Sequence, residues 1–177
     1  MHVGIVNFAI NDPRTELSDA LTSLGCSVVI IQHTDDWLNT IKRSRIKRWI
    51  CTGSALDVLD KNSPQLDVDL LKLDTKRFLL ICYSMESILM QLGCRIRNRR
   101  TEKNDNIMID DNGKQINVGR NHFAYVDANS IKPRMKLLSI YKGDVMTVEY
   151  KNAMMTQWHP ERTDDGRMFL KRWLQNT

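Results

Sequence analysis

The first half of the chain alternates between short apolar segments and amphipathic ones, and this alternation restricts the possible folds more than any other feature of the sequence. The apolar segments are rich in Val, Ile and Leu and predict strands over residues 2–8, 26–32, 48–53 and 78–82. The amphipathic segments predict helices over residues 13–25, 35–43, 63–73 and 84–93. Strands that are apolar along nearly their whole length and alternate with helices are typical of a parallel sheet covered on both faces.

The second half changes character and consists mainly of short segments with a period-two pattern. These segments are residues 95–100, 106–111, 114–120, 135–142 and 145–151. The turn sequences DNGK and KGD separate neighbouring segments, which predicts antiparallel strands added to the sheet or hairpins beside it. A strand within 153–159 and a helix over 165–175 follow, and the apolar face of this helix is expected to be Met168, Phe169, Trp173 and Leu174. We expect a single α/β domain over residues 1–177.

Composition excludes several classes of protein. With 42% hydrophobic and 27% charged residues, the chain resembles soluble globular proteins rather than disordered or fibrous ones. No apolar run approaches the ~20 residues that a membrane span needs, and the N-terminal MHVGIVNF lacks the features of a signal peptide, so we expect a cytoplasmic protein. The four cysteines show no CxxC and no tight clustering with histidine. We therefore expect no disulfide framework, metal or cofactor.

The net charge of +5 is modest, but Lys and Arg gather in two runs, at residues 41–49 and 95–100. Solvated surface at the ends of secondary-structure elements is the default interpretation of such runs. The alternative is a docking face for an acidic partner. Nucleic acid is the least favoured partner, because no aromatic residues are interleaved with the charges for base stacking.

Cys82 lies at the end of a predicted strand, just before a predicted helix. In parallel sheets, ligands bind beyond the carboxyl ends of the strands. The free N–H groups at the start of the helix would favour a thiolate and lower the pKa of Cys82. A strand-to-helix elbow also exposes its central side chain to the cleft. The position predicts a nucleophile, although a buried cysteine is more often a small core residue.

A nucleophilic cysteine needs a base, an orienting group and donors for an oxyanion. His159 and Glu161 lie two residues apart in an extended segment, so their side chains face the same way and the carboxylate can fix the tautomer of the imidazole. The N–H of Tyr83 is one candidate donor. Gly53, at the end of the neighbouring predicted strand, is the other, unless it simply makes a tight turn.

Four stretches together resemble the class I, triad-type glutamine amidotransferases, including the amidotransferase domains of GMP synthases and carbamoyl-phosphate synthases. They are ICTGSALDV (50–58), LLICYSMESILMQLG (79–93), RNHFAYVD (120–127) and MTQWHPE (155–161). The resemblance implies a flavodoxin-like fold and a glutaminase that forms a cysteine thioester and passes ammonia to a synthetase. It assigns the nucleophile to Cys82, the acid/base to His159, its orienting group to Glu161, the oxyanion donors to Gly53 and Tyr83, and substrate contacts to Asn121, His122, Phe123 and Ala124.

The chain departs from the family pattern at three positions around Cys82. Leu80 and Ser84 replace glycines, and Glu86 replaces a glutamine that contacts the bound substrate. Ser84 could act as a helix N-cap. Glu86 leaves open a hydrolase of another γ-glutamyl amide or peptide, and the two lost glycines leave open a non-catalytic binding module. Because the sequence shows no ATP-binding motif, we expect the synthetase to be a separate protein.

Overall fold

A seven-stranded sheet forms the centre of the protein in the computed structural model, which describes residues 1–9 and 16–176 except for the side chains of 99–104 and 123. In spatial order the strands are β2 (Ser27–Gln32), β1 (His2–Asn7), β3 (Arg48–Cys51), β4 (Arg77–Ile81), β9 (Ala153–Thr156), β8 (Asp144–Tyr150) and β7 (Lys136–Tyr141). The first five are parallel, and β8 and β7 are added antiparallel. The fold is therefore the α/β, flavodoxin-like arrangement with antiparallel additions that the sequence predicts.

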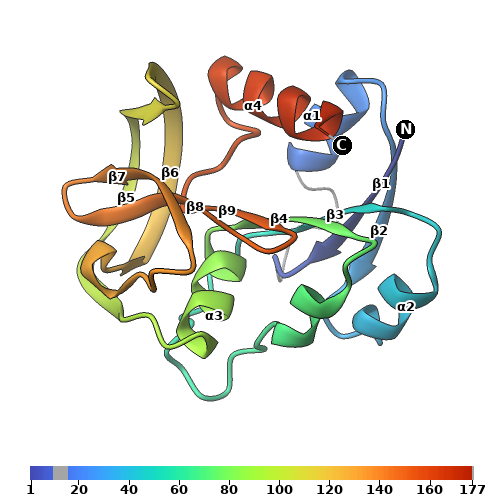
Figure 1. Cartoon of the computed structure of the whole chain (residues 1–177), viewed down its shortest axis with the longest axis horizontal. Helices are drawn as coiled ribbons and strands as arrows, with labels where there is room; N and C mark the ends of the chain where they lie inside the picture. Colours follow the sequence, from blue (N-terminus) through green and yellow to red (C-terminus); the bar gives the residue numbers. More distant parts are fainter. Residues whose placement is uncertain (10–15, 177) are drawn as a thin grey trace.

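Helices cover both faces of this sheet (Figure 1). One face carries α1 (Glu16–Ser23) and α4 (Asp164–Gln175), and the other carries α2 (Trp37–Arg43), α3 (Tyr83–Gln91) and the 3-10 helix η1 (Val68–Lys72). Successive residues of β4, a central strand, lie on opposite faces of the sheet and pack into different hydrophobic cores. Phe78 packs with α2 and α3, whereas Leu79 packs with α1 and α4. Two buried faces explain why these strands are apolar along nearly their whole length.

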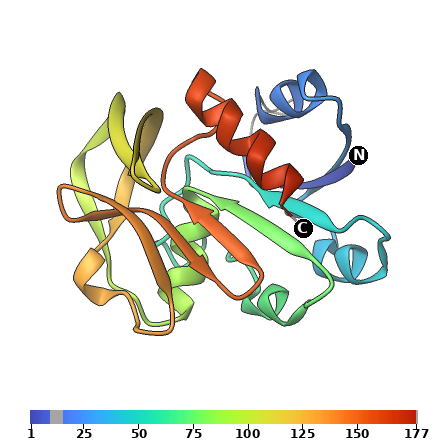
Figure 2. The same cartoon turned by 45° about the horizontal axis from the view of Figure 1, so that its top comes forward.

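A long hairpin stands beside the main sheet. Its strands β5 (Ile96–Asp111) and β6 (Lys114–Val126) pair with each other as a two-stranded sheet, and an isolated bridge joins Gly119 of β6 to His159. The 3-10 helix η2 (Ala128–Ser130) leads on to β7. Figure 2 shows the hairpin at the end of the body nearest β7 and β8. Asn112 and Gly113 have φ of 56° and 82°, the left-handed values that a tight hairpin turn requires. The segments 95–100 and 106–111, predicted as separate, thus belong almost entirely to one strand.

Several predicted helices differ from the observed ones. The described part of the first helix begins at Glu16, so Pro13 lies outside the described residues. The segment 63–73 forms only the short η1. In α4, Met168 is 52% exposed, and Leu170 is buried in its place. Successive helical residues turn by about 100°, so the side that carries Phe169, Leu170 and Leu174 leaves Met168 facing solvent.

The basic run at 95–100 is partly neutralised within the chain. Arg95 and Arg97 form ion pairs with Asp127 at 3.3 and 3.0 Å, and the side chains of Arg99 and Arg100 lie outside the described residues. These two pairs favour the solvated-surface interpretation for this run. In the part of the chain that the structure describes, no helix combines the length and the apolarity needed to cross a membrane.

Candidate active site

Cys82 occupies a strained elbow between β4 and α3. Its φ of 51° and ψ of −111° lie where a residue with a Cβ is rarely found. The N–H of Cys82 donates to the carbonyl of Thr156 at 2.7 Å, which ties the elbow to the end of β9. Cys82 directly follows the last residue of β4 and precedes the first residue of α3, so it lies at the carboxyl end of the sheet.

His159 and Glu161 form a hydrogen-bonded pair beyond the end of β9. His159 Nδ1 lies 2.9 Å from Glu161 Oε1, and the N–H of His159 donates to the carbonyl of Gly119 in β6 at 2.8 Å. Burial alone would raise the pKa of Glu161, but the hydrogen bond and charge of His159 outweigh it, and the pKa lies below its usual value. Glu161 therefore stays ionised and holds Nδ1–H, which leaves His159 Nε2 able to accept a proton.

Gly53 lies between the thiol and the imidazole. A Cβ added to Gly53 would stand 3.0 Å from His159 Cε1 and 3.3 Å from Cys82 Cβ. The loops that follow β3, β4 and β9, three adjacent parallel strands, thus bring Gly53, Cys82 and His159 together. Within the described residues, the N–H of Gly53 donates to no acceptor. The N–H of Tyr83 bonds to the Cys82 sulfur, and Gly53 lies beside Cys82.

The thiol is closed over in this structure. Cys82 is 4% exposed, and its Sγ lies 3.5 Å from the carbonyl oxygen of Asn121, to which it donates. Burial, the largest cause, raises the pKa of Cys82 well above its usual value, and the charge of Glu86 raises it further, against the lowering effect of Tyr83 N–H. The prediction of a lowered pKa for Cys82 is therefore wrong for this closed arrangement. His159 Nε2 is buried and has no hydrogen-bond partner among the described residues.

The predicted substrate segment lies near the end of β6, and the contact that its described residues make with the thiol is through a backbone carbonyl. Asn121 supplies the carbonyl beside Cys82. His122 is buried, with Nδ1 2.5 Å from the carbonyl oxygen of Ala124, so these two residues bond to each other. The side chain of Phe123 lies outside the described residues. The segment thus covers Cys82 at the place where the resemblance expects the substrate.

Glu86 lies close to the thiol and accepts a hydrogen bond from Gln157, a residue that the sequence did not single out. Gln157 Nε2 stands 2.7 Å from Glu86 Oε1 and 3.7 Å from Cys82 Sγ. Burial raises the pKa of Glu86 to about 7, although the Gln157 bond opposes this shift. The sequence could have indicated Gln157, because it lies two residues before His159 and alternate residues of an extended segment share a face.

Ser84 is not the N-cap that the sequence predicts. Cys82 occupies the N-cap position of α3 and makes no side-chain cap bond. The Ser84 hydroxyl instead donates to the carbonyl of Thr52 at 2.6 Å, across to the loop that follows β3. Leu80, the other departure from the family pattern, is a fully buried core residue of β4.

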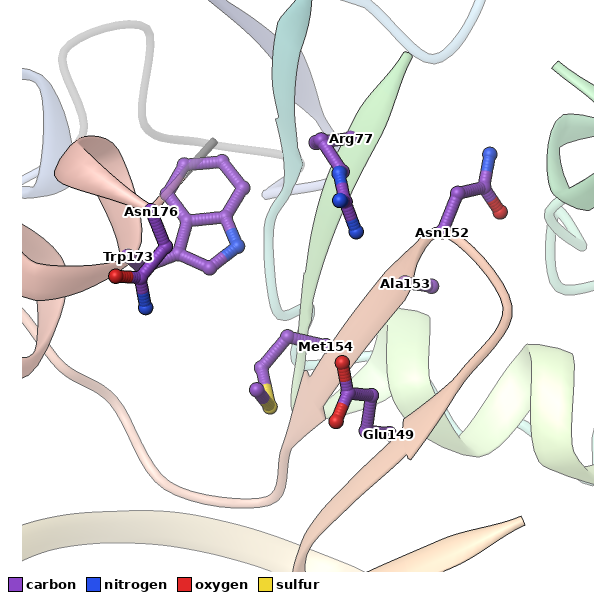
Figure 3. A pocket seen from close by; sticks show the side chains of 7 residues that line it. All are labelled: Arg77, Glu149, Asn152, Ala153, Met154, Trp173 and Asn176. Carbon is purple, nitrogen blue, oxygen red and sulfur yellow. The ribbon is translucent and has the colours of Figure 1, made fainter. Parts of the chain in front are cut away.

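A separate pocket lies at the opposite end of the parallel strands, where β4 and β9 begin. A pocket of about 190 Å³ is bordered by side chains from the starts of β4 and β9, from β8 and from the end of α4, among them Arg77, Glu149 and Trp173 (Figure 3). Arg77 is the first residue of β4, whereas Cys82 follows the last residue of that strand, so this pocket is remote from the thiol. Among the described residues, no group of His, Cys, Asp and Glu side chains could hold a metal ion.

Comparisons with known proteins bear on the family and the fold of this chain. A GMP synthase [glutamine-hydrolyzing] of Wigglesworthia glossinidia brevipalpis is 24% identical over 155 residues, which make up 76% of this chain and 30% of that protein. The crystal structure of a putative GMP synthase subunit from Thermoplasma acidophilum shares the fold, with a TM-score of 0.70 and 16% identity over 99% of this chain and 97% of that one. Residues 14–174 match the family described as glutamine amidotransferase class-I, and the chain therefore belongs to that family.

Proposed function

We propose that the chain is a glutaminase that hydrolyses the side-chain amide of glutamine through a thioester on Cys82 and supplies ammonia to a synthetase on a separate polypeptide. One observation carries the proposal: the ends of three adjacent strands bring Cys82, the bonded His159–Glu161 pair and Gly53 into contact. A nucleophile, an oriented base and a free backbone donor are the groups that acyl transfer requires.

In the first half of the reaction, the Cys82 thiol turns from the Asn121 carbonyl and gives its proton to His159 Nε2. The thiolate attacks the amide carbon, and the N–H groups of Gly53 and Tyr83 stabilise the negative oxygen that forms. Glu161 accepts Nδ1–H and stabilises the imidazolium. His159 then protonates the amide nitrogen, the C–N bond breaks, and ammonia leaves a γ-glutamyl thioester.

The second half repeats these roles with water. His159 Nε2 takes a proton from a water molecule as its oxygen attacks the thioester carbon, and the same N–H groups receive the oxyanion. The C–S bond breaks, the proton returns to Cys82, and glutamate is released. The side chains of this chain hold or move every proton, so the reaction requires no cofactor.

The comparisons support the separate partner. The neighbour from Thermoplasma acidophilum is described as one subunit of its enzyme, and this chain covers 97% of it. This chain spans only 30% of the length of the GMP synthase from Wigglesworthia. The description of the neighbour as a subunit favours a synthetase of the GMP synthase type on another polypeptide as the acceptor.

Glu86 favours one alternative, a hydrolase of another γ-glutamyl compound. Its carboxyl lies beneath the thiol, where a substrate ammonium could replace the hydrogen bond from Gln157. A charge-assisted bond of that kind contributes about 1.5–3 kcal/mol. Under this alternative, Glu86→Gln lowers kcat/KM for the true substrate by roughly 10- to 150-fold, whereas glutamine turnover by a true glutaminase is preserved or raised.

The test is release of glutamate and ammonia from glutamine and from a panel of γ-glutamyl amides. Cys82→Ala and His159→Ala should each lower kcat by at least about 10³-fold, and Glu161→Gln should cost less, because Glu161 orients the base. Cys26→Ala removes a cysteine remote from the site and should leave kcat unchanged. Wild-type protein that turns over none of these compounds, alone or with a candidate synthetase, would leave the non-catalytic module as the remaining interpretation.

A further inference from the structure

The Ser84 hydroxyl lies in the first turn of α3 and bonds to the loop that carries Gly53. We propose that Ser84 is a positioning residue for the oxyanion site: its hydroxyl holds the Thr52–Gly53 peptide in the orientation that leaves the Gly53 N–H free for the substrate oxygen. The proposal rests on the proposed function, since it assumes that Cys82 attacks an acyl carbon. It concerns a residue at which this chain departs from the family pattern of glycine.

The geometry of one peptide group carries the argument. The carbonyl of Thr52 and the N–H of Gly53 belong to the same planar unit and point in opposite directions. Ser84 Oγ donates to that carbonyl at 2.6 Å, and Ser84 and Thr52 are both buried, at 0% and 6% exposure. The carbonyl is thus directed toward α3, and the N–H points in the opposite direction within the same plane.

Gly53 itself lies next to Cys82 and His159. Gly53 packs so closely against Cys82 and His159 that an added Cβ would stand 3.3 and 3.0 Å from their atoms. Within the described residues, the Gly53 N–H donates to no protein acceptor. Rotation of this peptide would exchange the two groups and present a carbonyl oxygen to the developing oxyanion. That replacement would turn a stabilising contact into a repulsive one.

Other contacts of Thr52 fix the residue but leave its carbonyl to Ser84. Its N–H donates to Val6 at 3.1 Å, and its Oγ1 accepts from the N–H of Phe8 at 2.8 Å. Both bonds reach toward β1, on the side away from α3. They hold Thr52 at the end of β3. Its Oγ1 also donates to the carbonyl of Gly53 at 3.0 Å, which ties the peptide after Gly53, whereas Ser84 bonds to the carbonyl of the Thr52–Gly53 peptide itself.

The test compares two reactions of Cys82 that differ only in whether an oxyanion forms. Acylation by p-nitrophenyl acetate passes through a tetrahedral oxyanion, whereas alkylation by iodoacetamide does not. In Ser84→Ala and Ser84→Gly, we expect the acylation rate and the kcat for glutamine to fall by about 10- to 100-fold, less than the loss of a whole oxyanion donor. Alkylation of Cys82 and the KM should stay within about threefold, since the thiol and its approach are untouched.

Ser87→Ala is the matched control. Ser87 is equally buried in the same helix, and its hydroxyl bonds to Gln65 at 2.8 Å, away from the oxyanion site. This variant should lose similar stability yet keep the wild-type ratio of acylation to alkylation. Ser84→Thr, which retains the hydroxyl, should recover most of the acylation rate.

Two results would overturn the proposal. In one, acylation and alkylation fall together in Ser84→Ala, which would mean that the thiol itself has moved. In the other, the ratio of the two rates is the same in Ser84→Ala as in Ser87→Ala. Failure of the proposed function has a different signature, namely wild-type Cys82 that is acylated and alkylated normally while glutamine is not hydrolysed.

Discussion

The buried carboxyl of Glu86 makes the stability of this protein depend on pH in an unusual direction. Glu86 is 3% exposed and accepts a hydrogen bond from Gln157 at 2.7 Å. Burial raises its pKa to about 7 from the usual 4.5, the Gln157 bond opposes the shift, and the charge of Asp57 adds to it. The folded protein thus keeps a proton on Glu86 that the unfolded chain has already lost.

The sign and the size follow from proton linkage. Between pH 4.5 and pH 7 the folded state binds one proton more than the unfolded state at Glu86, so the free energy of unfolding falls as the pH rises. Each unit of pKa difference corresponds to about 1.4 kcal/mol, which gives a loss of about 3 kcal/mol by pH 8. Glu86→Gln keeps the shape and can still bond to Gln157, but it cannot ionise. The variant should match the wild type near pH 5 and exceed its stability by about 3 kcal/mol at pH 8.

Urea denaturation at pH 5, 6, 7 and 8 measures this difference directly. The quantity of interest is the gap between the two proteins, because every other titrating group is common to both. Glu149→Gln, a change at a half-buried carboxylate that leaves Glu86 in place, is the control for the loss of one carboxylate. A gap between wild type and Glu86→Gln that stays flat from pH 5 to pH 8 would refute the reasoning.

Three further changes give distinct outcomes. Gly53→Ala should lower kcat by about 10- to 100-fold, with a small change in Tm. The new Cβ would stand 3.0 Å from the His159 ring and displace that ring by a fraction of an ångström. Steady-state assays measure the first effect and thermal melts the second. Glu161 has a lowered pKa, so its stabilising effect is present above its usual pKa and is lost as the pH falls through the folded value; in acid titrations, Glu161→Gln should flatten that loss. Phe169→Ala should cost about 3–5 kcal/mol in urea denaturation, whereas Met168→Ala, at an exposed position of the same helix, should cost under about 0.5 kcal/mol.

The sheet could be predicted because its signal is local. Each of β1, β3 and β4 is apolar along nearly its whole length, since its residues face two cores in turn. The hairpin was less predictable, because β5 runs through polar residues whose pairing with β6 depends on a partner distant in the sequence. Met168 was assigned to the buried face because the pattern alone does not show which side of α4 meets the sheet.

The site could be predicted only as far as strand ends determine it. Cys82, Gly53 and His159 all follow parallel strands, and the carboxyl ends of such strands lie at one edge of the sheet. The closure of β6 over the thiol joins residues 39 apart in the sequence, and it reverses the predicted shift in the pKa of Cys82. No sequence pattern marks that contact, because a strand that covers the site has the same polarity as one that leaves it open.

Ser84 and Glu86 are best understood together, as two ties from one helical turn to the strands on either side. Ser84 bonds to Thr52 after β3, and Glu86 accepts from Gln157 after β9. β3 and β9 are the neighbours of β4, so the turn that follows Cys82 is held from both sides of the strand that precedes it. Leu80 and Ser84 stand where the family pattern has glycine, on either side of the strained backbone of Cys82. Their side chains leave less room in the elbow, so the elbow needs such support to keep the thiol beside His159. The cost is a buried carboxyl whose ionisation in the unfolded chain lowers the stability of the fold as the pH rises from 4.5 to 7, and the result is a thiol whose position relative to Gly53 and His159 is fixed by side chains on two sides.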